Sequence, residues 1–124
     1  MVSRRIRVMN VDDSTFVLSK LKNILEESDI SVVGQAKNGL KAISLYKKCH
    51  PDIVTLDINM PEMDGLSTLY TLKKLNPNVK VVMCTSLGTK DKVIEALKKG
   101  AKNFITKPFL PERVVAVIKK TFAD

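Results

Sequence analysis

Five polar side chains of this sequence have types and positions that could perform chemistry together: three acids, a hydroxyl and a lysine. They are Asp12, Asp13, Asp57, Thr85 and Lys107. They follow four short apolar segments, residues 6–11, 52–56, 79–84 and 102–106 in that order. These segments have the length and the β-branched content of buried strands. Because a carboxylate at the end of a buried strand is costly without a partner, Asp57 in particular indicates a site.

Three carboxylates, a hydroxyl and an ammonium group in proximity favour chemistry on a phosphoryl group with a metal ion. Mg²⁺ prefers oxygen ligands and is usually held by one or two carboxylates with water and phosphate oxygens. A divalent cation also removes the repulsion between neighbouring carboxylates. Asp57 can then act as the nucleophile and form an acyl phosphate. Lys107 and the Thr85 hydroxyl can interact with the transferred oxygens.

Each of these residues also has an ordinary structural explanation. Asp13 could cap the helix that follows it, Thr85 could belong to a turn, and Lys107 could be a solvated loop lysine. One shared site explains the four strand ends better than four independent coincidences do. We therefore favour a site.

The elements that must position these residues alternate along the whole chain. The predicted strands are residues 6–11, 31–35, 52–56, 79–84 and 102–106. Helices are predicted over 14–27, after an Asn38 cap, after the 61–65 turn, between Thr89 and Gly100, and from Pro111. Strict alternation predicts an α/β fold, a doubly wound five-stranded parallel sheet covered on both faces. We expect a single domain over 1–124, with the site outside the carboxyl ends of the strands.

Composition and charge exclude several classes of protein. The 124 residues carry a formal net charge of +8, but four Lys-Lys pairs fall in the last turns of predicted helices. Cations there offset the helix dipole, and aromatic residues are only 5%, so we expect no nucleic-acid partner. No apolar run approaches a membrane span or a signal peptide, so we expect no membrane partner and a cytoplasmic location. The two cysteines are expected to be free thiols, with Cys84 in the core.

Several short motifs together resemble the receiver domains of two-component response regulators, most closely the chemotaxis-type regulators. The motifs are Val11-Asp12-Asp13-Ser14, Asp52-Ile53-Val54-Thr55-Leu56-Asp57, Met60-Pro61-Glu62-Met63-Asp64-Gly65, Thr85-Ser86 and Phe104-Ile105-Thr106-Lys107-Pro108-Phe109. The resemblance covers essentially the whole chain. It implies a (βα)5 flavodoxin-like fold with strand order 2-1-3-4-5.

The resemblance also implies a role for each matching residue. Asp12 and Asp13 would be metal-site acids, Asp57 the phosphoacceptor and metal ligand, and Asn59 a Mg²⁺ ligand through its backbone carbonyl. Lys107 would pair with the phosphoryl group and precede a cis peptide bond to Pro108.

A second set of implied roles concerns the response to phosphorylation. Thr85 and Phe104 would be switch residues, and Leu87 matches a position that tunes the phosphoryl lifetime. The protein would be no enzyme beyond its own phosphorylation and dephosphorylation. Its phosphodonor would be a histidine kinase. Its output partner, such as a flagellar motor switch protein, would bind the face formed by the fourth helix, fifth strand and fifth helix.

Two alternatives remain open at this point. The chain could be the receiver piece of a larger regulator such as a chemotaxis methylesterase. Asn10 and residues 82–87 support this alternative. The Asn10 side chain is expected to be a hydrogen-bonded buried amide. From another class, it could be a Mg²⁺-dependent aspartyl phosphohydrolase of the haloacid-dehalogenase type. Those enzymes carry a second acid two residues after the nucleophile, where this chain has Asn59, so efficient turnover is not expected.

Overall fold

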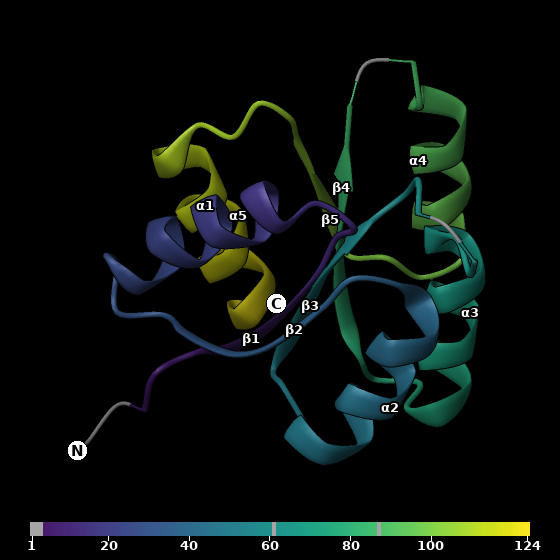
Figure 1. Ribbon diagram of the computed structural model, residues 1–124, viewed down its shortest axis with the longest axis horizontal. Coiled ribbons are helices and arrows are strands. Elements are labelled where there is room, and N and C mark those ends of the chain that lie inside the picture. The colour runs from purple at the N-terminus through teal and green to yellow at the C-terminus, as the bar shows by residue number, and fades with distance from the viewer. Residues whose placement is uncertain (1–3, 61, 87) are drawn as a thin grey trace.

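Five parallel strands form the central sheet of the protein (Figure 1). The computed structural model describes residues 4–60, 62–86 and 88–124. The strands are β1 (Arg7–Val11), β2 (Ser31–Ala36), β3 (Ile53–Asp57), β4 (Lys80–Thr85) and β5 (Asn103–Thr106). They lie in the order β2-β1-β3-β4-β5, which confirms the predicted topology.

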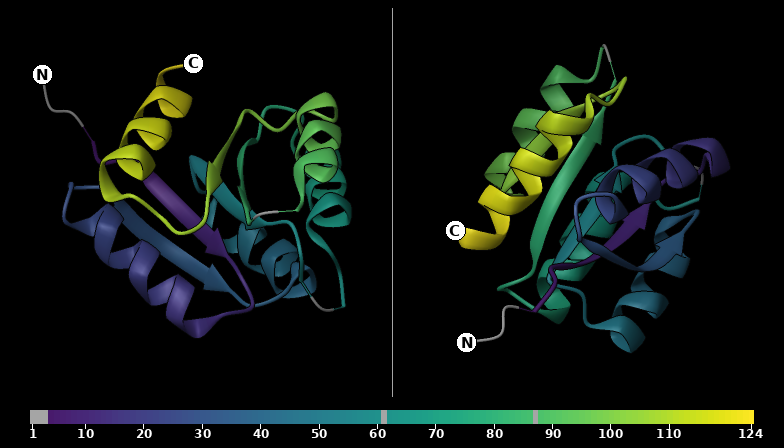
Figure 2. Two further views of the ribbon diagram at one scale, coloured as in Figure 1. Left: turned by 90° about the horizontal axis from the view of Figure 1, so that it is seen from above. Right: turned by 90° about the vertical axis from the view of Figure 1, so that its left-hand side faces the viewer.

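Within the described residues, five helices cover the two faces of the sheet. They are α1 (Thr15–Glu26), α2 (Gly39–Cys49), α3 (Gly65–Leu75), α4 (Lys90–Lys98) and α5 (Pro111–Ala123). Helices α1 and α5 lie on one face, and α2, α3 and α4 lie on the other (Figure 2). The doubly wound α/β architecture is therefore confirmed.

Each face of the sheet has its own apolar core. On one face, Val8 of β1 and Ile53 of β3 pack with apolar residues of α1 and α5. On the other, their neighbours Met9 and Val54 pack with residues of α2, α3 and α4. Neighbouring residues of a strand point to opposite faces, so strands covered on both sides are continuously apolar. This is why the sequence shows uninterrupted apolar runs there.

For most of the strands, the predicted carboxyl end was wrong by one residue. Asp57 and Thr85 are the last residues of β3 and β4 and lie within the ladder, where they pair with Cys84 and Thr106. The sequence pattern stops at the last apolar residue, whereas backbone pairing continues beyond it. Two polar side chains are consequently held by the sheet itself and not by a loop.

The helix ends differ in detail from the sequence expectations. The N-cap of α1 is Ser14, whose hydroxyl accepts from the Val17 N–H, so the capping explanation for Asp13 is wrong. Thr89 occupies the N-cap position of α4 but makes no side-chain capping bond. After α4, Gly100 has φ +108° and its N–H donates to the Leu97 carbonyl, as expected for a glycine that ends a helix.

Two of the four lysine pairs lie wholly in the last turn of a helix, as predicted, whereas of the other two pairs only Lys98 of α4 and Lys120 of α5 do. Lys47 and Lys48 are in the last turn of α2, and Lys73 and Lys74 are in the last turn of α3. The positive charge is thus spread over several helix ends. In the part of the chain that the structure describes, no helix combines the length and the apolar composition needed to cross a membrane.

Candidate functional site

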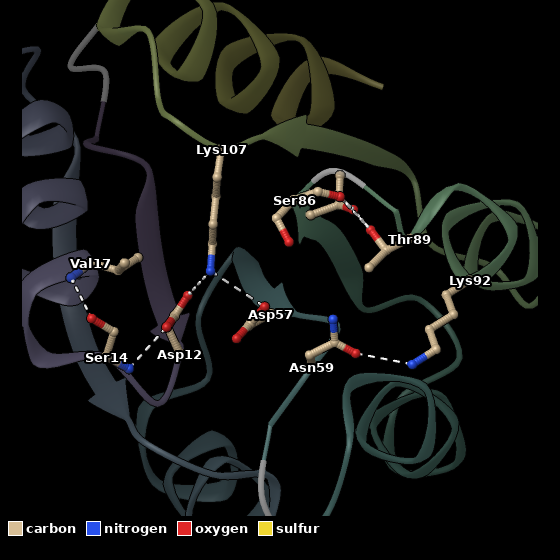
Figure 3. Close-up of polar contacts among 10 residues, drawn as sticks. Asp12, Ser14, Val17, Asp57, Asn59, Ser86, Thr89, Lys92 and Lys107 are labelled. Carbon is tan, nitrogen blue, oxygen red and sulfur yellow. Dashed lines mark hydrogen bonds and ion pairs between the residues drawn. The ribbon is translucent and has the colours of Figure 1, made fainter.

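The carboxyl ends of four strands converge at one edge of the sheet. Asp12 follows β1, Asp57 ends β3, Thr85 ends β4 and Lys107 follows β5. Figure 3 shows Asp12, Asp57 and Lys107 pointing toward one another, with Asn59 beside them. Parallel strands bring their carboxyl ends to the same edge, which is why residues far apart in sequence meet here.

Three acids form a compact cluster at this edge. One carboxylate oxygen each from Asp12, Asp13 and Asp57 lies within 4.8 Å of the other two. Asp12 is 3% and Asp57 is 6% exposed, whereas Asp13 is exposed. The Ser14 N–H donates to Asp12 at 3.0 Å, which fixes that carboxylate at the start of α1.

Lys107 supplies the positive charge of the cluster. Its Nζ lies 2.8 Å from an Asp12 oxygen and 3.5 Å from an Asp57 oxygen. The Lys107 N–H donates to the Thr85 carbonyl at 2.7 Å, and the bond to Pro108 is cis, as expected. Burial opposes the charge on Lys107, but the Asp12 hydrogen bond and the attraction of Asp57 outweigh it and raise the pKa of Lys107.

The ionisation of Asp57 is strongly perturbed. Burial and the neighbouring Asp12 charge raise its pKa from 3.8 to about 6, although Lys107 and the Asn59 N–H favour the carboxylate. A carboxylate with so high a pKa is incompletely compensated by the described residues around it. A bound cation would therefore favour its charged form.

Thr85 does not point its hydroxyl at Asp57. The hydroxyl lies 3.1 Å from the Ser86 carbonyl oxygen and contacts the Thr89 hydroxyl. Thr89 in turn donates to the Ser86 carbonyl at 2.8 Å. The Thr85 hydroxyl is therefore bonded toward the start of α4 in this structure.

Asn59 links the acid cluster to α4. Its N–H favours the charged form of the Asp57 carboxylate. Its side-chain oxygen accepts from Lys92 of α4 at 3.0 Å (Figure 3). Sequence reasoning missed Lys92, and it assigned Thr89 only a capping role. No spacing rule brings either side chain to the site, since both contacts depend on where α4 packs.

Phe104 lies partly buried in β5, against the core on the α4 side of the sheet. A cavity of about 310 Å³ lies between α4 and β5 beside it. The cavity is lined by Thr85, Ser86, Gly88, Lys90, Val93, Ile94, Leu97, Phe104 and Thr106. The two predicted switch residues therefore border one apolar hollow. Pro61 and Leu87, which also entered the sequence predictions, lie outside the described residues.

The residues of the cluster fit a magnesium ion. All the clustered acid ligands are carboxylate oxygens, the ligands that hard cations prefer. Three carboxylates and one ammonium group leave two net negative charges, which a divalent cation balances. The acidic pocket is thus of the kind that holds Mg²⁺.

Comparisons with known proteins agree with this geometry. Residues 8–119 match the model of the response regulator receiver domain. The chemotaxis protein CheY of Listeria monocytogenes is 47% identical over 115 residues, 93% of this chain and 97% of that protein. A chain of the CheX-CheY-BeF3-Mg+2 complex from Borrelia burgdorferi superposes with a TM-score of 0.92 at 35% identity, over 98% of this chain and 92% of that one.

A multidomain relative is also similar. The protein-glutamate methylesterase/protein-glutamine glutaminase of Pyrococcus horikoshii is 39% identical over 97% of this chain, which spans 36% of that protein. The matched family model covers nearly all of this chain, and the CheY proteins match it almost from end to end. The chain therefore belongs to the response regulator receiver domain family and is homologous to CheY.

Proposed function

We propose that Asp57 is the residue that accepts the phosphoryl group and that its phosphorylation switches a protein-binding face. The observation that carries this assignment is the place of Asp57 at the end of β3, buried, beside two other acids and 3.5 Å from Lys107. Membership of the family implies a kinase phosphodonor and a downstream target. Receiver domains are signalling switches and not classical enzymes.

The proposed reaction transfers a phosphoryl group from a histidine of the kinase. An Asp57 carboxylate oxygen forms a bond to phosphorus as the bond from phosphorus to the histidine nitrogen breaks. The nitrogen keeps the electron pair of that bond, and the product is an acyl phosphate. Lys107 can turn its ammonium group from Asp12 toward the phosphoryl oxygens, and Thr85 can donate its hydroxyl to one of them.

Asp12, Asp13, Asp57 and the Asn59 backbone carbonyl are the groups proposed to hold Mg²⁺. When bound, the ion supplies positive charge that neutralises the acids and the phosphoryl oxygens. The Ser14 N–H keeps one Asp12 oxygen in place, and the other oxygen, which Lys107 contacts, would become free when Lys107 turns away.

The proposed output face consists of α4, β5 and α5. Phosphate on Asp57 would attract the Thr85 hydroxyl inward, which changes the wall that Thr85 and Phe104 give to the α4–β5 cavity. Similarity to CheY supports a chemotaxis pathway, with a flagellar motor switch protein as the output partner. The multidomain relative supports the alternative that this receiver regulates an attached methylesterase.

The experiment that tests the assignment is phosphorylation by acetyl phosphate with and without Mg²⁺, read by intact mass. We expect a gain of one phosphoryl group that requires Mg²⁺ and is lost in Asp57→Asn. Asp29→Asn is the matched control, because Asp29 is an exposed acid outside the cluster and its φ of 61° suits asparagine equally well. Retention of the mass gain in Asp57→Asn would overturn the assignment.

A separate assay tests the proposal that the protein is no hydrolase. Asn59 stands where a general acid would be needed to protonate a leaving group, and an amide has no proton to give at neutral pH. We expect no steady turnover of a phosphomonoester such as p-nitrophenyl phosphate with Mg²⁺. Sustained turnover that disappears in Asp57→Asn would favour the phosphohydrolase alternative.

A further inference from the structure

The hydroxyl of Thr89 is used in an unusual way. A threonine at an N-cap normally accepts a hydrogen bond from an N–H in the first turn of its helix. Thr89 holds the N-cap position of α4 and makes no such bond. Its hydroxyl faces the Thr85 hydroxyl and the Ser86 carbonyl, and only 8% of Thr89 is exposed. The buried Thr89 hydroxyl therefore contacts residues at and just after the end of β4 and does not cap its own helix.

Proton counting shows what this contact does to Thr85. The two hydroxyls carry one proton each, and the Ser86 carbonyl is the third member of the group. Thr89 can donate to that carbonyl at 2.8 Å while Thr85 donates to Thr89, or Thr85 can itself donate to the carbonyl at 3.1 Å while it accepts from Thr89. In either arrangement Thr85 has no proton left for a phosphoryl oxygen on Asp57.

We infer that Thr89 is a positioning residue that holds the Thr85 hydroxyl away from the acid cluster in the unphosphorylated protein. The inference rests on the proposed function, since it concerns the hydroxyl that would bond the phosphoryl group. Thr85 can donate to Thr89 or to the phosphoryl oxygen, but not to both. Thr89 therefore sets part of the balance between the two states of the switch.

The position of Thr89 links the two states of the switch to β4 and α4. Thr89 directly precedes α4, and Thr85, at the end of β4, lines the same cavity as Phe104. The backbone of Thr89 has φ −113° and ψ 19°, outside the extended region typical of an N-cap. The contact thus joins the last residue of β4 to the N-cap of α4, a helix of the proposed output face.

The test compares Thr89→Val with Thr89→Ser. Valine keeps the branched shape at this buried position and removes the hydroxyl, whereas serine keeps the hydroxyl. With acetyl phosphate below saturation and Mg²⁺ present, we expect Thr89→Val to be phosphorylated roughly three- to ten-fold faster than the natural chain, as expected for one lost hydrogen bond. Thr89→Ser is expected to restore the natural rate. Equal rates in all three proteins would overturn the inference.

A double-mutant comparison separates positioning from a merely structural effect. In a Thr85→Ala background there is no hydroxyl to hold, so Thr89→Val is expected to leave the phosphorylation rate unchanged. If valine acted only by loosening α4, the acceleration would persist without the Thr85 hydroxyl. Persistence would therefore contradict the role assigned to Thr89.

A measurement on the unphosphorylated protein keeps this inference separate from the proposed function. Three-bond couplings of the Thr85 methyl carbon give the χ1 rotamer of Thr85 by NMR. We expect Thr89→Val to change the rotamer populations and Thr89→Ser to keep them. An unchanged rotamer in Thr89→Val would overturn the inference, whether or not the chain accepts a phosphoryl group. A natural chain that gains no phosphoryl mass would instead overturn the proposed function.

Discussion

The ammonium nitrogen of Lys107 lies 2.8 Å from Asp12, whereas its distance to Asp57 is 3.5 Å. Lys107 is therefore paired chiefly with the acid that follows β1, and the acid that ends β3 is left less compensated. The raised pKa of Asp57, about 6, is the electrostatic consequence. The same geometry puts Lys107 where its charge opposes that of a cation bound by the acids.

Replacing Lys107 by methionine is expected to strengthen Mg²⁺ binding. The substitution removes a positive charge that contacts two of the three acids, while methionine keeps most of the length of the side chain. We expect an increase in affinity of about ten-fold at low salt and a smaller one at high salt. Isothermal titration calorimetry measures it. Lys102→Met is the control, because Lys102 is an exposed lysine outside the cluster; an equal change in both variants would contradict a local effect.

The stability of the protein without Mg²⁺ is expected to depend on pH through Asp57. The folded-state pKa of about 6 lies above the ordinary 3.8, so the folded chain disfavours the carboxylate. This cost is fully present above about pH 6 and is relieved as the pH falls through 6 toward 4. Asp57→Asn should therefore raise the free energy of unfolding near neutral pH, on the order of 1 kcal/mol, and by little near pH 4. Urea unfolding in the presence of a chelator measures the difference.

Asp52 provides a control of opposite sign. Hydrogen bonds from the Arg4 side chain and the Arg7 N–H outweigh partial burial and hold the pKa of Asp52 below its ordinary value. Such a carboxylate stabilises the fold above about pH 4, and the stabilisation is lost as the pH falls through the lowered pKa. Asp52→Asn should thus destabilise the protein near neutral pH. If both variants followed the same pH profile, the raised pKa of Asp57 would be wrong.

The fold and the convergence of the acids could be predicted because strand periodicity fixes them. Once the chain alternates between strands and helices, Asp12, Asp57 and Lys107 must meet at the carboxyl edge of the sheet. The direction of the Thr85 hydroxyl could not be predicted, because it depends on one rotamer and on the packing of α4. The Lys92–Asn59 bond was missed for the same reason, since long side chains meet across elements without leaving a sequence pattern.

Asn10 was predicted only in part. It is fully buried, and its oxygen accepts from the Thr55 hydroxyl at 2.6 Å, as a hydrogen-bonded amide should. Its amide nitrogen, however, has no hydrogen-bond partner among the described residues. A sequence can indicate that a buried amide needs partners, but it cannot count how many of them the surrounding core provides.

Gly65 is expected to be required for the backbone that carries Asp57. A Cβ at Gly65 would meet the Asp57 backbone oxygen and lie 2.7 Å from the Ile58 Cα, and neither atom can move without moving the chain. We expect Gly65→Ala to cost about 1–3 kcal/mol of stability and to slow phosphorylation as well. Urea unfolding and the acetyl phosphate reaction measure the two effects.

The control for Gly65 is a glycine that faces only side chains. A Cβ at Gly34 would meet Leu45 and Cys49 side-chain atoms, which can give way, on the α2 side of the sheet. Gly34→Ala should therefore leave the phosphorylation rate unchanged even if it lowers stability. Normal phosphorylation of Gly65→Ala would show that the Asp57 backbone tolerates displacement, contrary to this prediction.

The buried pair of Asn10 and Thr55 is expected to behave as one unit in a double-mutant cycle. Asn10→Leu leaves the Thr55 hydroxyl without its acceptor, and Thr55→Val leaves the Asn10 oxygen without its donor, so each single variant should lose about 1–3 kcal/mol. The double variant removes both polar groups together with the unpartnered amide nitrogen. It should therefore be more stable than either single variant, with a coupling energy of at least about 1 kcal/mol by urea unfolding. Additive losses would show that the two side chains are satisfied independently.

The same pair lies close to the acid cluster, because Asn10 and Thr55 lie in β1 and β3 two residues before Asp12 and Asp57. The phosphorylation rate of the double variant therefore measures whether the site needs the polar side chains of Asn10 and Thr55 in the strands that carry it.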